Sequence, residues 1–307
     1  MKLSVVSTLY KSAPFIREFH ARASRVAAEL AGDDYEIVFV NDGSPDNSLD
    51  VALKLTREDK HIVVVDLSRN FGHHKAMMAG LEQARGDLLF LIDVDLEEEP
   101  EYLASFAQQL EKEECDVVYG VQDSRKGGWF ERWSGALFYA IFDRLTYIEH
   151  PRNPLTMRLM TRRYVDALLG FREQEMVISC LWVITGFKQS EQVVKKHKRR
   201  GTSYSLTAKF SHMVNAVTSF SAAPLMLIFY SGLIIFCASL LYSFYIVYLR
   251  LVGLRPVDGW TSLIVSVWLL GGLVILFLGV IGIYLSKVFA ETKRRPLSIV
   301  RKVYGRS

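Results

Sequence analysis

The chain has 307 residues, of which 50% are hydrophobic, and a formal net charge of +4. This length allows one α/β domain of about 200 residues beside a region of different character. Its three cysteines, Cys115, Cys180 and Cys237, lack a C-x-x-C spacing and indicate neither a disulfide framework nor a zinc site. Because the basic excess is modest and lies beside two apolar stretches, we expect anionic headgroups or a phosphate-bearing lipid as partners, and no nucleic acid.

Short apolar runs alternate with amphipathic stretches through the N-terminal part of the chain. The predicted strands are Leu3–Leu9, Glu36–Val40, His61–Leu67, Leu88–Ile92 and Asp116–Val121. The predicted helices are Phe15–Leu30, Leu49–Glu58, His74–Ala84 and Glu101–Glu113. This alternation predicts an α/β fold with a mostly parallel sheet that is covered by helices on both faces.

Acidic residues directly follow two of the predicted strands. Asp42 follows the second, and Asp93-Val94-Asp95 follows the fourth. Ligands of open parallel sheets bind outside the carboxyl ends of the strands, so these carboxylates are candidate site residues. Two carboxylates at a buried strand end need a compensating charge, and a divalent cation with oxygen ligands supplies one. A glycosidase would need its carboxylates on opposite sides of the scissile bond, and both the P-loop and the G-x-G-x-x-G motifs are missing.

Two long stretches near the C-terminal end carry almost no charge. Pro224–Leu249 and Ser262–Leu285 each exceed the roughly 20 apolar residues needed to cross a bilayer, so both are predicted transmembrane helices. Basic residues precede the first stretch and follow the second, which places both chain ends in the cytoplasm by the positive-inside rule. Ala208–Phe220 is predicted to lie in the membrane interface, while a core position and an interfacial position fit Trp129–Leu145 equally.

Ordered motifs along the chain resemble those of family 2 glycosyltransferases of the dolichyl-phosphate mannose synthase type. The closer similarity is to bacterial polyisoprenyl-phosphate glycosyltransferases with two C-terminal transmembrane helices. The motifs that carry the resemblance are Ser4–Tyr10, Val40–Ser44, Ser68–Gly72, Asp93–Leu96 with Pro100-Glu101, Arg158–Arg163 and Thr218–Ser221.

The resemblance implies a GT-A type fold and a division of the chain into four parts. These are a cytoplasmic GT-A domain (1–205), a juxtamembrane amphipathic helix (206–223), two transmembrane helices (224–289) and a basic cytoplasmic tail (290–307). It also implies a site for the nucleotide of the sugar donor at Leu9, Tyr10, Asp42 and Asp93.

The resemblance further implies a metal and a place for the acceptor. Mg²⁺ or Mn²⁺ would be held by Asp93, Asp95 and Glu97, with Asp93, Asp95 and Arg158 as catalytic residues. Arg125 and Arg132 would meet the acceptor phosphate. His73 and His74, at the start of a helix, either approach a phosphate or only cap and pack.

Three departures from the family pattern leave some contacts open. Glu97 stands where the family usually has Gln, Gln122 where it commonly has Arg, and Leu155-Thr156-Met157 where it has Gly-Asp-Phe. An acidic Glu97 either binds the metal more tightly or is solvated. The other two changes affect the expected acceptor and sugar contacts.

The implied activity is inverting transfer of a sugar from a nucleotide-sugar, with UDP favoured, to polyisoprenyl (undecaprenyl) phosphate. The product would be a lipid-phosphate-linked monosaccharide for cell-envelope glycans, made at the inner membrane by a multi-pass protein. A separate flippase and a homo-oligomer, a tetramer by family analogy, are further implied partners. Two alternatives remain: a non-catalytic membrane scaffold of the same fold, and a processive polysaccharide synthase, which the missing Q-x-x-R-W motif disfavours.

Overall fold

The structure is a computed structural model that describes residues 2–122, 154–174, 176–195, 218, 221–252 and 259–306. The chain divides into two units. The first comprises Met1–Asp143, Ile148–Ser203 and Arg295–Ser307, and the second comprises Arg144–Tyr147 and Tyr204–Arg294. The C-terminal residues therefore belong to the same unit as the N-terminal ones.

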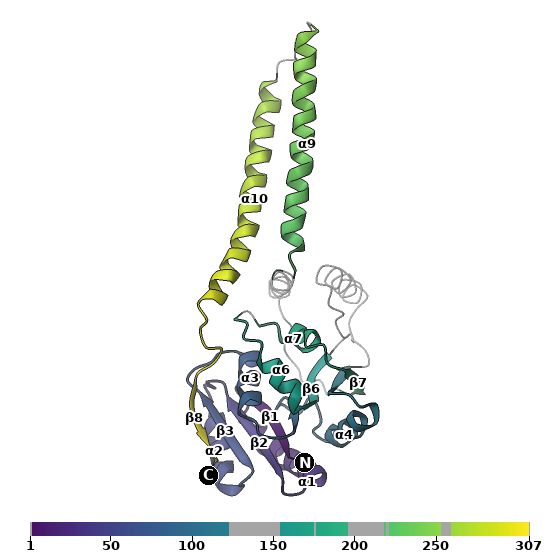
Figure 1. Ribbon diagram of the computed structural model, residues 1–307. Coiled ribbons are helices and arrows are strands. Elements are labelled where there is room, and N and C mark those ends of the chain that lie inside the picture. Colours follow the sequence, from purple (N-terminus) through teal and green to yellow (C-terminus); the bar gives the residue numbers. More distant parts are fainter. Residues whose placement is uncertain are drawn as a thin grey trace. The chain divides into compact units, whose positions relative to one another are not determined.

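Within the described ranges, the first unit is built on an eight-stranded sheet (Figure 1). Its strand order is β7-β5-β6-β4-β1-β2-β3-β8. The strands are β1 (Leu3–Leu9), β2 (Tyr35–Asn41), β3 (Ile62–Leu67), β4 (Leu88–Leu91), β5 (Val117–Gln122), β6 (Pro154–Thr161), β7 (Gln189–Val194) and β8 (Val300–Tyr304). Strands β1 to β4 run parallel to one another, whereas β6 and β8 run antiparallel to their neighbours. The predicted mostly parallel α/β sheet is thereby confirmed.

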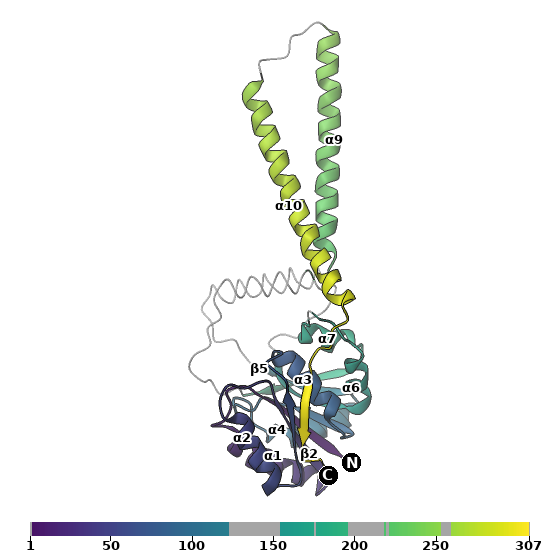
Figure 2. The ribbon, with the colours of Figure 1, turned by 90° about the vertical axis from the view of Figure 1, so that its left-hand side faces the viewer.

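Helices cover both faces of this sheet (Figure 2). One face carries α1 (Ile16–Ala31), α2 (Ser48–Glu58) and α4 (Tyr102–Glu113), and the other carries α3 (His73–Gln83) and α6 (Arg162–Leu169), with α7 (Ile178–Ile184) following in the chain. Phe19 of α1 and Phe106 of α4 are fully buried against Phe39 and Phe90 of the sheet. On the opposite face α3 lies close to the strands, since a Cβ on Gly80 would come within 2.6 Å of Val6.

The predicted strands and helices of the N-terminal part are all present, with ends that shift by at most one residue. Strands β6, β7 and β8 were not predicted. Strand β6 contains a buried arginine, β7 is mostly polar, and β8 lies inside the segment that the sequence analysis treated only as a basic tail. That description of residues 290–307 is corrected here: the tail is basic, but its end is also a strand of the sheet.

The described part of the second unit contains two long helices, α9 (Ala223–Leu251, 29 residues) and α10 (Trp260–Thr292, 33 residues). Among the described residues, the segment Leu269–Thr292 of α10 is long and apolar enough to cross a membrane, whereas the apolar stretch Pro224–Ile235 of α9 is too short to meet that test. The predicted pair of spans is therefore not confirmed and stays a prediction. The predicted amphipathic segments Trp129–Leu145 and Ala208–Phe220 lie outside the described residues, apart from Thr218.

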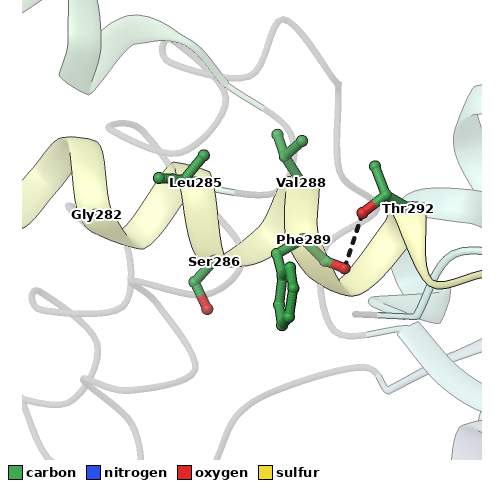
Figure 3. Close-up of a pocket in the computed structure, with 6 residues that line it drawn as sticks. All are labelled: Gly282, Leu285, Ser286, Val288, Phe289 and Thr292. Atoms are coloured by element: carbon green, nitrogen blue, oxygen red, sulfur yellow. Dashed lines mark hydrogen bonds between the residues drawn. The ribbon is translucent and has the colours of Figure 1, made fainter.

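An open groove runs along the end of α10 (Figure 3). The Thr292 hydroxyl donates to the Phe289 carbonyl at 3.0 Å within it. The residues that line the groove are Gly282, Leu285, Ser286, Val288, Phe289 and Thr292. Because none of these side chains is charged, they offer no counter-charge for a phosphate.

Candidate active site

The carboxyl ends of β1, β2, β3 and β4 meet at one edge of the sheet, and the loops that follow them carry the predicted site residues. Leu9 ends β1 and is fully buried, while Tyr10 directly after it is 49% exposed. Asp42 follows β2, His73 begins the helix after β3, and Asp93 follows β4. The fold thus brings together residues that lie more than 80 positions apart in the chain.

Asp42 joins three of these loops through backbone hydrogen bonds. The backbone N–H groups of Phe71 and Gly72 donate to its two carboxylate oxygens, at 2.7 and 3.1 Å, and its own N–H donates to the Leu9 carbonyl at 3.1 Å. The side chain is only 2% exposed. Asp42 therefore holds the backbone of the loop before α3, in addition to the predicted role toward a nucleotide.

Gly43 lets two loop backbones approach each other at this edge. Its φ is +58°, and a Cβ at this position would lie 2.5 Å from the backbone nitrogen of Asn70. Any other residue would force the two loops apart. The close approach keeps the Phe71 and Gly72 amides within reach of Asp42.

Asp46 organises the loops after β1 and β2. It accepts hydrogen bonds from the Ser44 and Ser48 hydroxyls and from the backbone N–H groups of Ser48 and Ala13. Burial alone would raise the pKa of this carboxyl, but these hydrogen bonds outweigh it and lower the pKa from 3.8 to about 2. A permanently ionised Asp46 fixes the backbone that follows Leu9 and Tyr10.

Asp93 lies at the end of a short polar chain across the site. The His73 Nε2 atom is 3.4 Å from Asp93 Oδ1, and His73 Nδ1 is 3.0 Å from the Thr8 hydroxyl. The Asp93 side chain is 25% exposed, so its carboxylate can still reach a ligand. His73 thus contacts both the end of β1 and the first aspartate of the D-x-D motif, instead of only capping its helix.

The rest of the D-x-D loop is shaped by its own backbone. Asp95 Oδ1 accepts the Glu97 N–H at 3.0 Å, and Leu96 between them has a φ of +60°, which is costly for a leucine. Glu98 is 1% exposed and accepts the backbone N–H of Met157 at 3.0 Å, which ties this loop to β6. The loop therefore leaves Asp93 and Asp95 partly exposed, while its other end is anchored.

The carboxylates fit a divalent cation only in part. In the part of the chain that the structure describes, no three His, Cys, Asp or Glu side chains are grouped as a metal site. Asp93 and Asp95 can supply two oxygen ligands at the edge of the sheet. Hard cations commonly take one or two carboxylates and complete their shell with substrate phosphates and water, so the donor set fits a metal that arrives with a diphosphate.

Arg158 lies in the interior, in β6 between Leu91 of β4 and Tyr119 of β5. Its side chain is 1% exposed, donates to the carbonyls of Thr156 and Leu155, and stacks 3.0 Å from the centre of the Trp182 ring. Burial lowers its pKa from 12.5 to about 10, so it stays charged at neutral pH. Both the phosphate contact and the catalytic role expected of Arg158 stay predictions.

The structure places the other predicted residues as follows. Glu97 is partly exposed beside Asp95, and Gln122 is partly exposed at the end of β5. Arg125 and Arg132 lie outside the described residues, so their expected contact with an acceptor phosphate stays a prediction.

Sequence reasoning missed Asp46 and Glu98 and left the role of His73 open. Asp46 could have been found from Ser44 and Ser48, which flank it at the spacing of a side-chain-bonded turn. Glu98 differs from Glu97 and Glu99 only in its burial, and the contact of His73 with Asp93 depends on strand pairing. No local sequence pattern indicates the burial of Glu98 or the contact of His73 with Asp93.

Several known proteins are similar to this chain over most of its length. A relative from Mycobacterium tuberculosis (strain CDC 1551 / Oshkosh), named as putative glycosyltransferases, is 46% identical and covers 99% of this chain and 89% of its own length. The SfII prophage-derived bactoprenol glucosyl transferase of Shigella flexneri is 29% identical and covers 98% of each chain. The crystal structure of S. aureus TarS 1–349 in complex with UDP-GlcNAc is similar with a TM-score of 0.50, at 17% identity, over 71% of this chain and 66% of that one, which supports the GT-A type fold. The sequence model described as Glycosyl transferase family 2 matches residues 4–169, and the chain belongs to that family.

Proposed function

We propose that the protein transfers a sugar from a nucleoside-diphosphate sugar to polyisoprenyl phosphate, with inversion at the anomeric carbon. UDP is the favoured nucleotide of the donor. The observation that carries this proposal is the pair of partly exposed carboxylates, Asp93 and Asp95, at the carboxyl edge of the sheet. The relative named a bactoprenol glucosyl transferase, aligned over 98% of both chains, supports a polyprenyl acceptor such as undecaprenyl phosphate. The product would be a lipid-phosphate-linked monosaccharide for cell-envelope glycans.

The donor side of the site is formed by the loops after β1, β2 and β4. Leu9 and Tyr10 would hold the nucleoside with Asp42, and Asp93 would contact the ribose. Asp93 and Asp95, with Glu97 as a further oxygen ligand, would hold Mg²⁺ or Mn²⁺. When bound, such a cation neutralises the diphosphate of the departing nucleotide. His73 keeps Asp93 oriented toward the open edge through its contact at 3.4 Å.

The acceptor needs orientation and neutralisation more than proton removal. A phosphate monoester has its second pKa near about 6, so the lipid phosphate is already largely a dianion at neutral pH. One of its oxygens forms the bond to the anomeric carbon while the bond from that carbon to the diphosphate breaks, and the nucleoside diphosphate leaves with the electron pair. Arg125 and Arg132 would offset the repulsion between the two anionic substrates, with Arg158 supporting the site from the interior.

The second unit would keep this reaction at the membrane. The apolar segment Leu269–Thr292 and the long helix α9 support a two-span anchor with both chain ends in the cytoplasm. The positive-inside rule applied to the flanking basic residues supports that orientation. A product made on the cytoplasmic side would need a separate flippase to cross the bilayer, and a homo-oligomer of this anchor is part of the same proposal.

The proposal is tested by transfer of radiolabelled sugar from a panel of UDP- and GDP-sugars to undecaprenyl phosphate. The full chain, purified in detergent, is assayed with Mg²⁺, with Mn²⁺ and with EDTA, beside Asp95→Ala. The matched control is Asp50→Ala, which removes an exposed carboxylate from the first turn of α2.

Formation of one lipid-linked sugar that needs both the metal and Asp95, and is unaffected by Asp50→Ala, is the expected result. A product with retained anomeric configuration would contradict the inverting mechanism. No transfer from any donor by folded protein would favour the scaffold of the same fold.

A further inference from the structure

The chain returns to the sheet after α10 and ends as part of the unit that holds the D-x-D motif. Strand β8 pairs antiparallel with β3, with Val65 opposite Val303 and Asp66 opposite Lys302, at the outer edge of the parallel strands (Figure 1). Just before this strand, the Ile299 carbonyl accepts the Ser68 N–H at 2.9 Å. The C-terminal segment is therefore hydrogen-bonded to the start of the loop that leads from β3 to α3.

Arg301 of β8 binds the end of β3 with both arms of its guanidinium. One nitrogen is 3.3 Å from Asp66 Oδ2, and the other donates to the Ser68 carbonyl at 2.7 Å. Asp66 is 1% exposed, and its second oxygen accepts the Asn41 side-chain amide at 2.8 Å. A buried carboxylate needs such partners, because an uncompensated charge inside a protein is costly.

The loop held by Arg301 is the same loop that Asp42 holds at its other end. Between Ser68 and His73, the backbone N–H groups of Phe71 and Gly72 donate to Asp42, and His73 then contacts Asp93. The loop is thus fixed at its start by the C-terminal strand and at its end by a residue of the candidate nucleotide site. A shift at either end changes where the Asp42 carboxylate and the His73 imidazole lie.

We propose that Arg301 is a positioning residue for the nucleotide donor, and that β8 contributes to the donor site through this residue. This inference rests on the proposed function, because it needs a nucleotide to bind at Asp42 and Asp93. Arg301 sets the start of the 68–72 loop and thereby the geometry of Asp42 and His73. It does not itself touch the nucleotide.

A simpler role for β8 would be to cover the edge of β3, since uncovered edge strands invite aggregation. Covering the edge of β3 depends on the backbone of β8, to which Arg301 and its neighbour Lys302 both belong. It does not depend on the guanidinium of Arg301. The Lys302 Nζ atom lies 4.8 Å from the centre of the Tyr304 ring. Replacing one or the other side chain by Gln removes the same charge from the same strand and separates the two roles.

The experiment compares the wild-type full chain in detergent with Arg301→Gln, Arg301→Lys and Lys302→Gln. UDP affinity is measured in the presence of Mn²⁺, with GDP in parallel, and hydrogen exchange is followed in peptides that cover residues 66–73. We expect Arg301→Gln to weaken UDP binding about tenfold and to speed exchange in that loop, because it loses charge-assisted bonds to Asp66 and Ser68. Arg301→Lys should recover part of the affinity, and Lys302→Gln should match the wild type.

Arg301→Gln with unchanged nucleotide affinity, or a Lys302→Gln variant that loses affinity equally, would overturn the inference. Loss of affinity together with a melting temperature that falls by the same amount in both Gln variants would assign β8 to edge cover alone. If the wild-type chain binds no nucleotide, the proposed function fails and the donor role of Arg301 falls with it. Hydrogen exchange then still decides whether Arg301 holds the loop.

Discussion

Two pairs of aspartates lie at the same edge of the sheet and differ in what surrounds them. Asp42 and Asp66 are 2% and 1% exposed, and their oxygens are engaged by backbone amides, Asn41 and Arg301. Asp93 and Asp95 are partly exposed and keep access to solvent. One pair holds loops in place and the other stays accessible to solvent, although each of these residues comes at or just after the end of a parallel strand.

The difference arises from the hydrogen-bond donors that neighbouring loops and strands offer to each carboxylate. The loop after β3 folds back over β2 and offers two N–H groups to Asp42, and the C-terminal strand offers a guanidinium to Asp66. In the loop after β4, Leu96 has a φ of +60°, and the loop is anchored to β6 by Glu98. A carboxylate that stays partly exposed can still be reached by an external cation, which would stabilise its charge.

The largest expected effect is on the partly exposed pair. Asp95→Ala should lower the rate of sugar transfer at least about 100-fold, because it removes a ligand of the proposed metal. Its melting temperature should stay within about 2 °C of the wild type, since a half-exposed carboxylate contributes little to stability. Transfer assays and thermal unfolding of the same preparations provide the measurement. A large loss of stability in this variant would remove the contrast between the two pairs.

For the buried pair, we expect substitution to lower the stability of the fold. Asp42→Ala leaves the Phe71 and Gly72 amides without their acceptor and should cost about 2 to 3 kcal/mol of stability, or roughly 5 to 10 °C in melting temperature. Asp42→Asn, which keeps one acceptor oxygen, should lose less. Thermal unfolding without nucleotide isolates this effect from binding. An Asp42→Ala variant as stable as the wild type would show that Asp42 does not hold the loop.

His73 lies between the two pairs and should have an intermediate effect. His73→Ala removes the contact with Asp93 and should reduce transfer about tenfold and raise the Mn²⁺ concentration needed for half-maximal rate. The melting temperature should change little, because the imidazole is 46% exposed. His74→Ala removes the next imidazole in the same helix and should have the smaller effect. Equal effects of the two substitutions would argue against a specific role for His73.

The smallest expected effect concerns Asp46 and its dependence on pH. Its pKa is lowered from 3.8 to about 2, so its hydrogen bonds stabilise the folded chain above about pH 4 and are lost as the pH falls toward about pH 2. With allowance for its partial exposure, the contribution is of order 1 kcal/mol. The melting-temperature difference between wild type and Asp46→Asn should therefore shrink over this interval. Asp50→Asn should show no such trend, and a constant difference for Asp46→Asn would contradict the assignment.

The sequence was sufficient to predict elements whose pattern is local. Strands β1 to β5 and helices α1 to α4 follow from apolar periodicity over short windows, and Asp42, Asp93 and Asp95 follow from their places after strands. Strand β6 was not predicted because Arg158 interrupts its apolar pattern. The charge of Arg158 is accommodated by two carbonyls of its own strand and by the Trp182 ring, which comes from elsewhere in the fold. Strand β8 was not predicted because its partner β3 lies more than 230 residues earlier in the chain. The separation of 235 residues between Arg301 and Asp66 illustrates this.

By itself, the sequence determined the class of fold and the family and proposed candidate cation ligands, since periodicity and motif order are properties of neighbouring residues. Only the tertiary structure decided which aspartates remain available and which are engaged within the protein. Burial and hydrogen-bond partners come from strands and loops that meet only after folding. The same reason makes Arg301, which in the sequence is one basic residue among many in a tail, a contact of the loop that Asp42 holds.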